Sequence, residues 1–240
     1  MKKEVILMYS GGLDSILSCI RLVRDGYKVY LINFDNGSSI GSENIQKGAE
    51  RLINRFKNDV EFLGIASTAS YFLYYRNMAD IENLNAKELF EKCGKISISQ
   101  YRCLLCRMAM YTYSIALARK MGISYIAEGA RKSQLFAIEQ DELLNEFRDL
   151  CKKFNIELLT PVLDVVDDYE KENEIYMWDQ NLGACESKCL LGFPMNRELT
   201  SEELNDIKKF YKSIRYLQEK DISEERVILQ KLPKDKITWY

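Results

Sequence analysis

Histidine is absent from the 240 residues of this chain. The sequence therefore contains no Ser-His or Cys-His catalytic pair and no histidine ligand for zinc. Proton transfer has to come from carboxylates, lysine, tyrosine, cysteine, water or the substrate itself. This absence excludes every catalytic class that is built on a histidine.

Long apolar runs are also absent, and none approaches the length needed to cross a bilayer. The first apolar stretch, Val5–Tyr9, is too short for a signal peptide and runs straight into two glycines. The formal net charge of −2 gives no general attraction to nucleic acid, although a local basic face would still allow it. We therefore expect a cytoplasmic protein without membrane contact.

Cysteine, in contrast, is well represented, with seven residues of which four form two close pairs. The pairs are Cys103 with Cys106 and Cys185 with Cys189. In a cytosolic protein, such pairs bind metal or take part in chemistry more often than they form disulfides. The remaining three are expected to be structural: Cys19, Cys93 and Cys151.

The apolar pattern alternates short β-branched runs with amphipathic helical segments. Strands are predicted at 5–9, 29–34, 60–65 and 124–128, with a last short strand at 160–163. Helices are predicted between them, one of them from Cys106 to Lys120 and another from Asp168 to Leu182. This order predicts an α/β fold with a doubly wound, mostly parallel sheet and helices on both faces.

The predicted catalytic domain spans residues 1–195, and residues 66–102 interrupt the rhythm as an insertion near the site. Residues 196–240 are expected to form a small C-terminal extension. Within it, Thr200 begins a helix with a capping box, which runs to about Glu219. A hairpin is expected after this helix.

The segment from Ser10 to Ser15 reads Ser-Gly-Gly-Leu-Asp-Ser and joins the first strand to the first helix. Gly11 and Gly12 allow the backbone to turn sharply and to approach an anion closely. Exposed N–H groups and the helix dipole then favour phosphate. The two serines add hydroxyl donors, and Asp14 can hold Mg²⁺. The Walker lysine and the Rossmann glycine pattern are both missing, so the loop belongs to neither type.

This loop resembles the SGGxDS motif of PP-loop ATP pyrophosphatases, and the resemblance extends over about residues 3–195. In that family, backbone groups at the end of the second strand hold adenine. Many sulfur-transferring relatives carry Gly-His after the fourth strand, whereas this chain has Gly129-Ala130-Arg131-Lys132, which is closer to phosphoadenylyl-sulfate reductases. Arg131 and Lys132 are expected to bind phosphate or a carboxylate, with plain surface charge as the alternative. The resemblance implies that ATP is bound by Ser10, Gly11, Gly12, Leu13, Asp14, Ser15, Asn33, Phe34, Gly129, Arg131 and Lys132.

The cysteines extend the resemblance to PP-loop tRNA 2-thiolation enzymes. There, a Cys-x-x-Cys at the start of the helix before the fourth strand, with one distant cysteine, holds a [4Fe–4S] cluster that has an open iron. Cys103 and Cys106 match that motif, and Cys189 is the expected third ligand. Cys185 is the expected sulfur carrier, or a fourth ligand if the site is a closed zinc centre. In 7-cyano-7-deazaguanine synthases four cysteines hold zinc, but only Cys189 lies near one of those positions.

The expected reaction is ATP-dependent adenylation of a substrate carbonyl, followed by sulfur insertion with release of AMP and pyrophosphate. Asp14 and Cys185 are the expected catalytic residues. The expected cofactors are ATP, Mg²⁺ and a [4Fe–4S] cluster, with zinc as the alternative to the cluster. The alternatives are a carboxylate-activating synthase with structural zinc, a nucleotide-sulfate reductase-like enzyme, and a nucleotide-binding module without catalysis. The acceptor is a tRNA base or a small molecule. A sulfur donor protein and a homodimer are the other expected partners.

Overall fold

The computed structural model describes residues 2–41, 43–79, 98–190 and 197–229. Cys93 and residues 230–240, which include most of the predicted hairpin, lie outside these ranges. No helix among the described residues is long and apolar enough to span a membrane.

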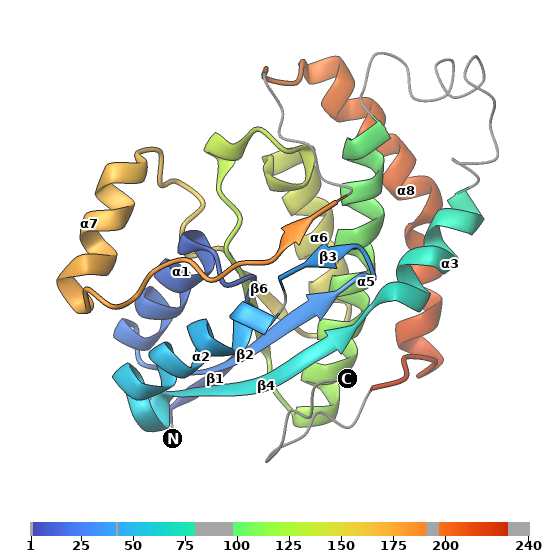
Figure 1. Ribbon diagram of the computed structural model, residues 1–240. Coiled ribbons are helices and arrows are strands. Elements are labelled where there is room, and N and C mark those ends of the chain that lie inside the picture. The colour runs from blue at the N-terminus through green and yellow to red at the C-terminus, as the bar shows by residue number, and fades with distance from the viewer. Residues whose placement is uncertain (1, 42, 80–97, 191–196, 230–240) are drawn as a thin grey trace.

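A five-stranded parallel sheet forms the centre of the molecule (Figure 1). Its strands lie in the order β4-β2-β1-β5-β6, and every neighbouring pair is parallel. The strands are β1 (Lys3–Met8), β2 (Tyr27–Asp35), β4 (Val60–Ser67), β5 (Tyr125–Glu128) and β6 (Glu157–Leu159). This sheet confirms the predicted fold class and four of the five predicted strands.

Helices cover both faces of the sheet because successive residues of each strand point to opposite sides. In β1, Val5 and Leu7 face one apolar core, and Ile6 and Met8 face the other. The first core is closed by α1 (Leu13–Arg24), α2 (Glu43–Phe56) and α7 (Asp168–Trp178). The second core is closed by α3 (Ala69–Ala79), α5 (Ile98–Met121), α6 (Asp141–Lys153) and α8 (Ser201–Ser223).

Helix α5 begins earlier than the sequence predicted. It starts at Ile98 rather than at Cys106, because its apolar face continues upstream through Tyr101 and Leu104 into the core. The prediction that the Cys-x-x-Cys opens this helix is therefore wrong: Cys103 and Cys106 lie inside it.

The last predicted strand is also misplaced. Residues 160–163 form a turn, closed by a hydrogen bond from Leu163 N to Thr160 O (3.2 Å), and the fifth strand is the preceding β6. Helix α7 ends at Trp178 rather than Leu182, because Asp179 is already extended.

The predicted insertion and the predicted C-terminal extension both contribute to the core. α3 lies in the expected insertion, yet its Phe72 and Tyr75 are buried in the same apolar cluster as α5. α8 begins with the predicted capping box between Thr200 and Glu203, and it packs on α3, α5 and α6.

The sheet order sets the position of a ligand site. From β1 the chain proceeds to β2 and β4 on one side, and later to β5 and β6 on the other. The carboxyl ends of β1 and β5 are therefore the switch point, where ligands bind in such sheets. A small antiparallel ribbon of β3 (Ser39–Ile40) and β7 (Lys188–Cys189) lies near this edge.

Candidate active site

A cavity of about 610 Å³ opens at the switch point. One end is lined by the loop after β1, and the other end by α5 and the ribbon strand β7. Of the residues predicted to bind ATP, the following line it: Ser10, Gly12, Leu13, Asp14, Ser15, Asn33, Phe34, Gly129 and Arg131.

The loop after β1 depends on glycine at two places. Gly11 has φ +82°, and a Cβ there would lie 2.7 Å from the carbonyl oxygen of Cys185. Gly129 packs on the loop from β5, where a Cβ would lie 3.0 Å from the backbone of Asp14. Larger residues would push both backbones apart, so these glycines set the closed shape of the loop.

The hydroxyl groups of the loop fix its conformation. Gly12 N donates to Ser10 Oγ (3.2 Å), and Ser15 Oγ donates to the carbonyl oxygen of Gly12 (2.8 Å). Gly12 also caps α1 without a side-chain hydrogen bond. The first N–H groups of α1 therefore lack a side-chain cap beside the cavity, as an anion site requires.

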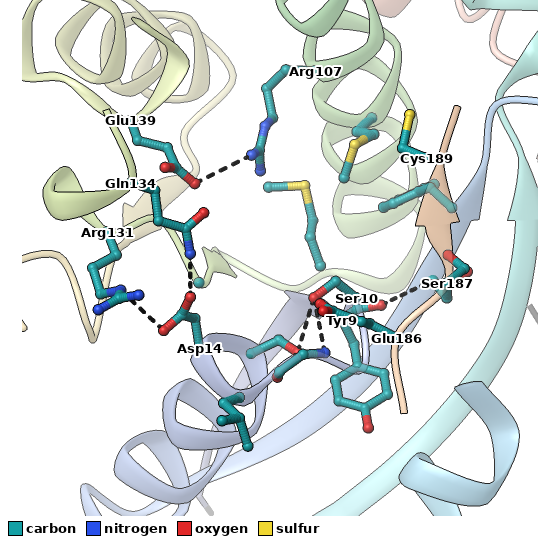
Figure 2. A pocket seen from close by; sticks show the side chains of 18 of the residues that line it. Tyr9, Ser10, Asp14, Arg107, Arg131, Gln134, Glu139, Glu186, Ser187 and Cys189 are labelled. Atoms are coloured by element: carbon teal, nitrogen blue, oxygen red, sulfur yellow. Dashed lines mark hydrogen bonds and ion pairs between the residues drawn. The ribbon is translucent and has the colours of Figure 1, made fainter. Parts of the chain in front are cut away.

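Asp14 is the centre of a charged cluster on the left of Figure 2. Its carboxylate forms ion pairs with Lys171 (3.0 Å) and Arg131 (3.2 Å), and Gln134 donates a short hydrogen bond to it. Both cations also pair with Asp168, and the hydrogen bond from Lys171 lowers the pKa of that carboxyl. Arg131 and Lys171 both contact Oδ1 of Asp14 and Gln134 contacts Oδ2, so a Mg²⁺ ion bound there would share the carboxylate with these partners.

Lys171 and Gln134 were not predicted as site residues. Lys171 is 5 % exposed although it is a lysine, and its Nζ reaches Asp14 from α7, 157 positions away. Nothing in its local sequence marks it, because the surrounding helix is acidic and exposed. Only the packing of α7 beside α1 brings this cation to the loop.

Arg131 and Lys132 have different surroundings. Arg131 is 7 % exposed and lines the cavity. Lys132 is not among the lining residues and pairs instead with Asp141 (2.8 Å). Arg131 therefore lies in the cavity wall, paired with Asp14 and Asp168, whereas Lys132 lies outside the cavity wall.

The end of β2 forms the next part of the wall. Asn33 is buried and donates from Nδ2 to the carbonyl oxygen of Tyr9 (2.8 Å), which ties β2 to the loop. Phe34 lines the cavity and packs edge-on against Tyr113 of α5, with ring centroids 5.7 Å apart. An apolar ring beside a strand edge is a suitable surface for adenine.

Three thiols line the opposite end of the cavity: Cys103, Cys106 and Cys189. Cys106 accepts a hydrogen bond from Asn36 Nδ2 (3.2 Å). Burial raises the pKa of Cys103 to about 12, and the nearby Cys106 and Cys189 add to the shift. Within the described ranges, however, no group of three or more cysteines and carboxylates is arranged as a metal site.

Cys185 lies apart from these three. It is not among the lining residues, and its side chain packs beside Gly48 of α2, with Sγ 3.6 Å from Arg51 Nη1. Its N–H donates to the carbonyl oxygen of Gly11 (2.8 Å). The structure therefore brings together Cys103, Cys106 and Cys189, and it does not bring Cys185 to them.

Residues 184–189 connect the two ends of the cavity, and we call them the crossing segment. Glu186 places its carboxylate against Gly12, so an added Cβ there would meet Glu186 Oε2 unless that side chain moved (Figure 2). Three residues later, Cys189 pairs with Ser39 in the β3–β7 ribbon. One short segment thus contacts both the phosphate loop and the thiol end.

A second charged cluster was missed by the sequence analysis. Arg107 follows Cys106 on α5 and donates from Nη1 to Glu128 Oε2 (2.5 Å). Tyr111 donates to the other oxygen of Glu128 (2.5 Å), and Glu139 lies 4.0 Å from Arg107. Arg107 and Glu139 both line the cavity between the loop and the thiols. An arginine directly after a Cys-x-x-Cys was the only local signal.

Comparison with known proteins gives one family match. Residues 1–187 match the family model described as thiamine biosynthesis protein (ThiI). A probable tRNA sulfurtransferase of Metamycoplasma arthritidis is 24 % identical over 215 residues, covering 86 % of this chain and 50 % of that protein. A probable tRNA sulfurtransferase of Methanothermobacter thermautotrophicus is 25 % identical over 173 residues, covering 71 % of this chain and 39 % of that protein.

Among solved structures, a 4-thiouridine synthetase in complex with RNA and bound ATP has the same fold. Its TM-score is 0.57 at 13 % sequence identity, covering 92 % of this chain and 53 % of that one. The expected PP-loop architecture is thereby confirmed. The chain spans about half the length or less of the curated relatives it matches.

Proposed function

The chain belongs to the family of the thiamine biosynthesis protein ThiI, and from this premise we propose that it thiolates a tRNA base at the expense of ATP. The proposal rests on one observation: a single cavity is lined by the loop Ser10–Ser15 and by the thiols of Cys103, Cys106 and Cys189. Activation by ATP and attack by sulfur at the same carbon need these two groups within one site.

In the first step, the carbonyl oxygen of the base attacks the α-phosphate of ATP and pyrophosphate leaves. The loop and the N-terminus of α1 hold the phosphates through backbone N–H groups. Arg131 and Lys171 neutralise the charge that develops on the leaving pyrophosphate. Asp14 holds both cations in place and is the expected ligand of Mg²⁺.

In the second step, the outer sulfur of a cysteine persulfide attacks the activated carbon and AMP leaves. A second cysteine thiolate then attacks the inner sulfur of the carrier, so that the S–S bond to the base breaks, the thiolated base is released and a Cys–Cys disulfide forms. An external thiol reductant reduces this disulfide before the next turnover. Among the described cysteines, the carrier is best sought in the three that line the cavity, because Cys185 packs against α2. The soft thiolate ligands that Cys103, Cys106 and Cys189 provide suit a [4Fe–4S] cluster. Such a cluster would supply an open iron as a sulfur-binding position, and Cys189 would have to approach the α5 pair.

The test uses the full chain with Mg-ATP, unmodified tRNA and a sulfide or persulfide donor. We expect AMP and pyrophosphate as products, and a thiolated nucleoside in digests of the tRNA by mass spectrometry. Asp14→Asn should lower the rate of AMP formation by about 100-fold or more, because it removes the charge that holds Arg131 and Lys171. Asp25→Asn, at the exposed end of α1, is the matched control and should keep the wild-type rate.

Formation of ADP and orthophosphate alone would refute the adenylation step. If AMP forms with tRNA but no base gains sulfur, the activation step stands and the sulfur transfer does not. Anaerobic purification separates the metal alternatives, because a brown iron protein supports the cluster and a colourless zinc protein supports the synthase-like alternative.

A further inference from the structure

Glu139 is a buried carboxyl with one oxygen that lacks a partner. It ends the short helix η3 (Ala137–Glu139), is 6 % exposed and lines the cavity. Its Oε2 has no hydrogen-bond partner among the described residues. Buried polar atoms nearly always have a partner, so this oxygen is available to a donor that the structure does not contain.

The charges around Glu139 disfavour its ionised form. Arg107, the nearest cation, already forms a short bond with Glu128, so two carboxylates share one guanidinium. Asp14 adds further negative charge, and Arg131 only partly offsets it. Burial is the largest cause, and it raises the pKa of Glu139 to about 8. The side chain can therefore gain and lose a proton near neutral pH.

Glu139 also lies at the place where an acceptor ring has to sit. On one side, Gln134 lies in the same connection between β5 and α6 as Glu139, and it donates a hydrogen bond to Asp14 of the phosphate loop. On the other side, Arg107 directly follows the thiol of Cys106 on α5. Figure 2 shows Glu139 and Arg107 above the loop, with Cys189 on the far side of Arg107 from Glu139. A ring placed between ATP and sulfur would meet this carboxyl at its edge.

We propose that Glu139 accepts the ring N–H next to the reacting carbonyl of the base and takes that proton as the carbonyl oxygen is adenylated. This inference rests on the proposed function. The sulfur acceptor that it implies is a lactam, a ring in which N–H and C=O are neighbours. Uracil and hypoxanthine rings qualify, whereas cytosine and adenine do not, because they have no such pair.

The proton transfer balances. The ring N–H bond breaks, and its electron pair forms a ring C=N bond while the carbonyl oxygen bonds to the α-phosphorus. The bond from phosphorus to pyrophosphate breaks, and Glu139 is left as a neutral carboxyl. When sulfur replaces AMP and the thiocarbonyl forms, the ring nitrogen regains a proton from Glu139. The base is thereby reset without a further proton donor.

The test compares wild type with Glu139→Gln in AMP formation on tRNA, at saturating Mg-ATP and across pH 6–9. We expect the wild-type rate to rise with pH and to level off near pH 8, the pKa of Glu139. Glu139→Gln should lose about 100-fold or more and show no such rise. Glu139→Asp should keep the rise at a reduced rate, and Asp149→Asn, on the exposed face of α6, should behave as wild type.

Binding of Mg-ATP, measured as the rise in melting temperature, should be unchanged in Glu139→Gln, which shows that the variant is folded. If Glu139→Gln keeps the wild-type rate and pH dependence, the assignment of Glu139 is wrong while tRNA thiolation stands. If wild type forms no AMP with tRNA, the proposed function and this inference fall together. If Glu139→Asp loses as much rate as Glu139→Gln at every pH, the assignment is also wrong.

Discussion

Burial determines the protonation of Glu139 whatever the substrate is, so its effect on stability can be measured without any assay. The pKa is about 8 in the folded chain, above the ordinary value of 4.5. The folded state therefore binds the proton more tightly than the unfolded state. This contribution to stability is complete below about pH 4.5 and is lost as the pH rises through about 8.

We expect Glu139→Gln to be more stable than wild type at pH 8–9, and this difference to shrink towards pH 5. The amide cannot ionise, so the variant does not bear the cost of a buried charge. Urea unfolding of both proteins at several pH values measures the difference. A constant difference between pH 5 and pH 9 would show that Glu139 titrates normally.

The cysteines give a second prediction for single residues. Cys185 packs against α2, whereas Cys103, Cys106 and Cys189 line the cavity. After anaerobic reconstitution, Cys185→Ser should therefore retain iron and acid-labile sulfide, and serine at any of the other three should lose most of both. Loss of iron in Cys185→Ser to the same extent would favour a closed site of four ligands.

The crossing segment acts at the scale of an element. Its Glu186 carboxylate rests on Gly12, at the place where the helix α1 dipole attracts anions. A nucleotide phosphate and this carboxylate are both negative, so ATP has to displace Glu186. The same segment continues into β7, which carries Cys189.

We expect Glu186→Gln to bind Mg-ATP more tightly than wild type, by several-fold to about tenfold, which corresponds to about 1.4 kcal/mol at most. Titration calorimetry measures the change. Glu170→Gln, on the exposed first turn of α7, is the matched control for the loss of one negative charge. Weaker binding in Glu186→Gln would indicate that the carboxylate assists the nucleotide, for example as a ligand of Mg²⁺.

At the scale of the whole molecule, a buried polar network joins α8 to the helices α3 and α5. Tyr75 of α3 donates to Asp221 of α8 (3.1 Å) and lies 2.9 Å from Thr112 of α5. Gln218 of α8 donates to the carbonyl oxygen of Met108 (2.9 Å). Such groups are costly to bury unless each has its partners.

We expect Tyr75→Phe to lower the free energy of unfolding by about 1–3 kcal/mol, because it leaves Asp221 and Thr112 without this partner. The unfolding curve should remain a single transition that is the same by fluorescence and by circular dichroism. Two separate transitions would show that α8 folds independently of the sheet. Tyr74→Phe, on the more exposed neighbouring residue, is the control.

The sequence by itself determined the sheet and the loop. The β-branched strands and the string from Ser10 to Ser15 are local patterns, and local patterns report backbone geometry directly. The same holds for the capping box at Thr200, which the structure confirms. Where local signals were weak, the predictions were wrong, as at residues 160–163, which form a turn rather than a strand.

Tertiary structure alone decided which side chains meet in the cavity. Lys171 pairs with Asp14 across 157 positions, and Glu139 approaches Arg107 from another helix. The spacing of Cys185 and Cys189 suggested a shared site, yet the crossing segment is extended enough to send them to different neighbours. Contacts between distant residues depend on how helices pack over the sheet, and a one-dimensional pattern does not contain that packing. The sequence therefore predicted the phosphate loop and the thiols, and the fold assigned their partners.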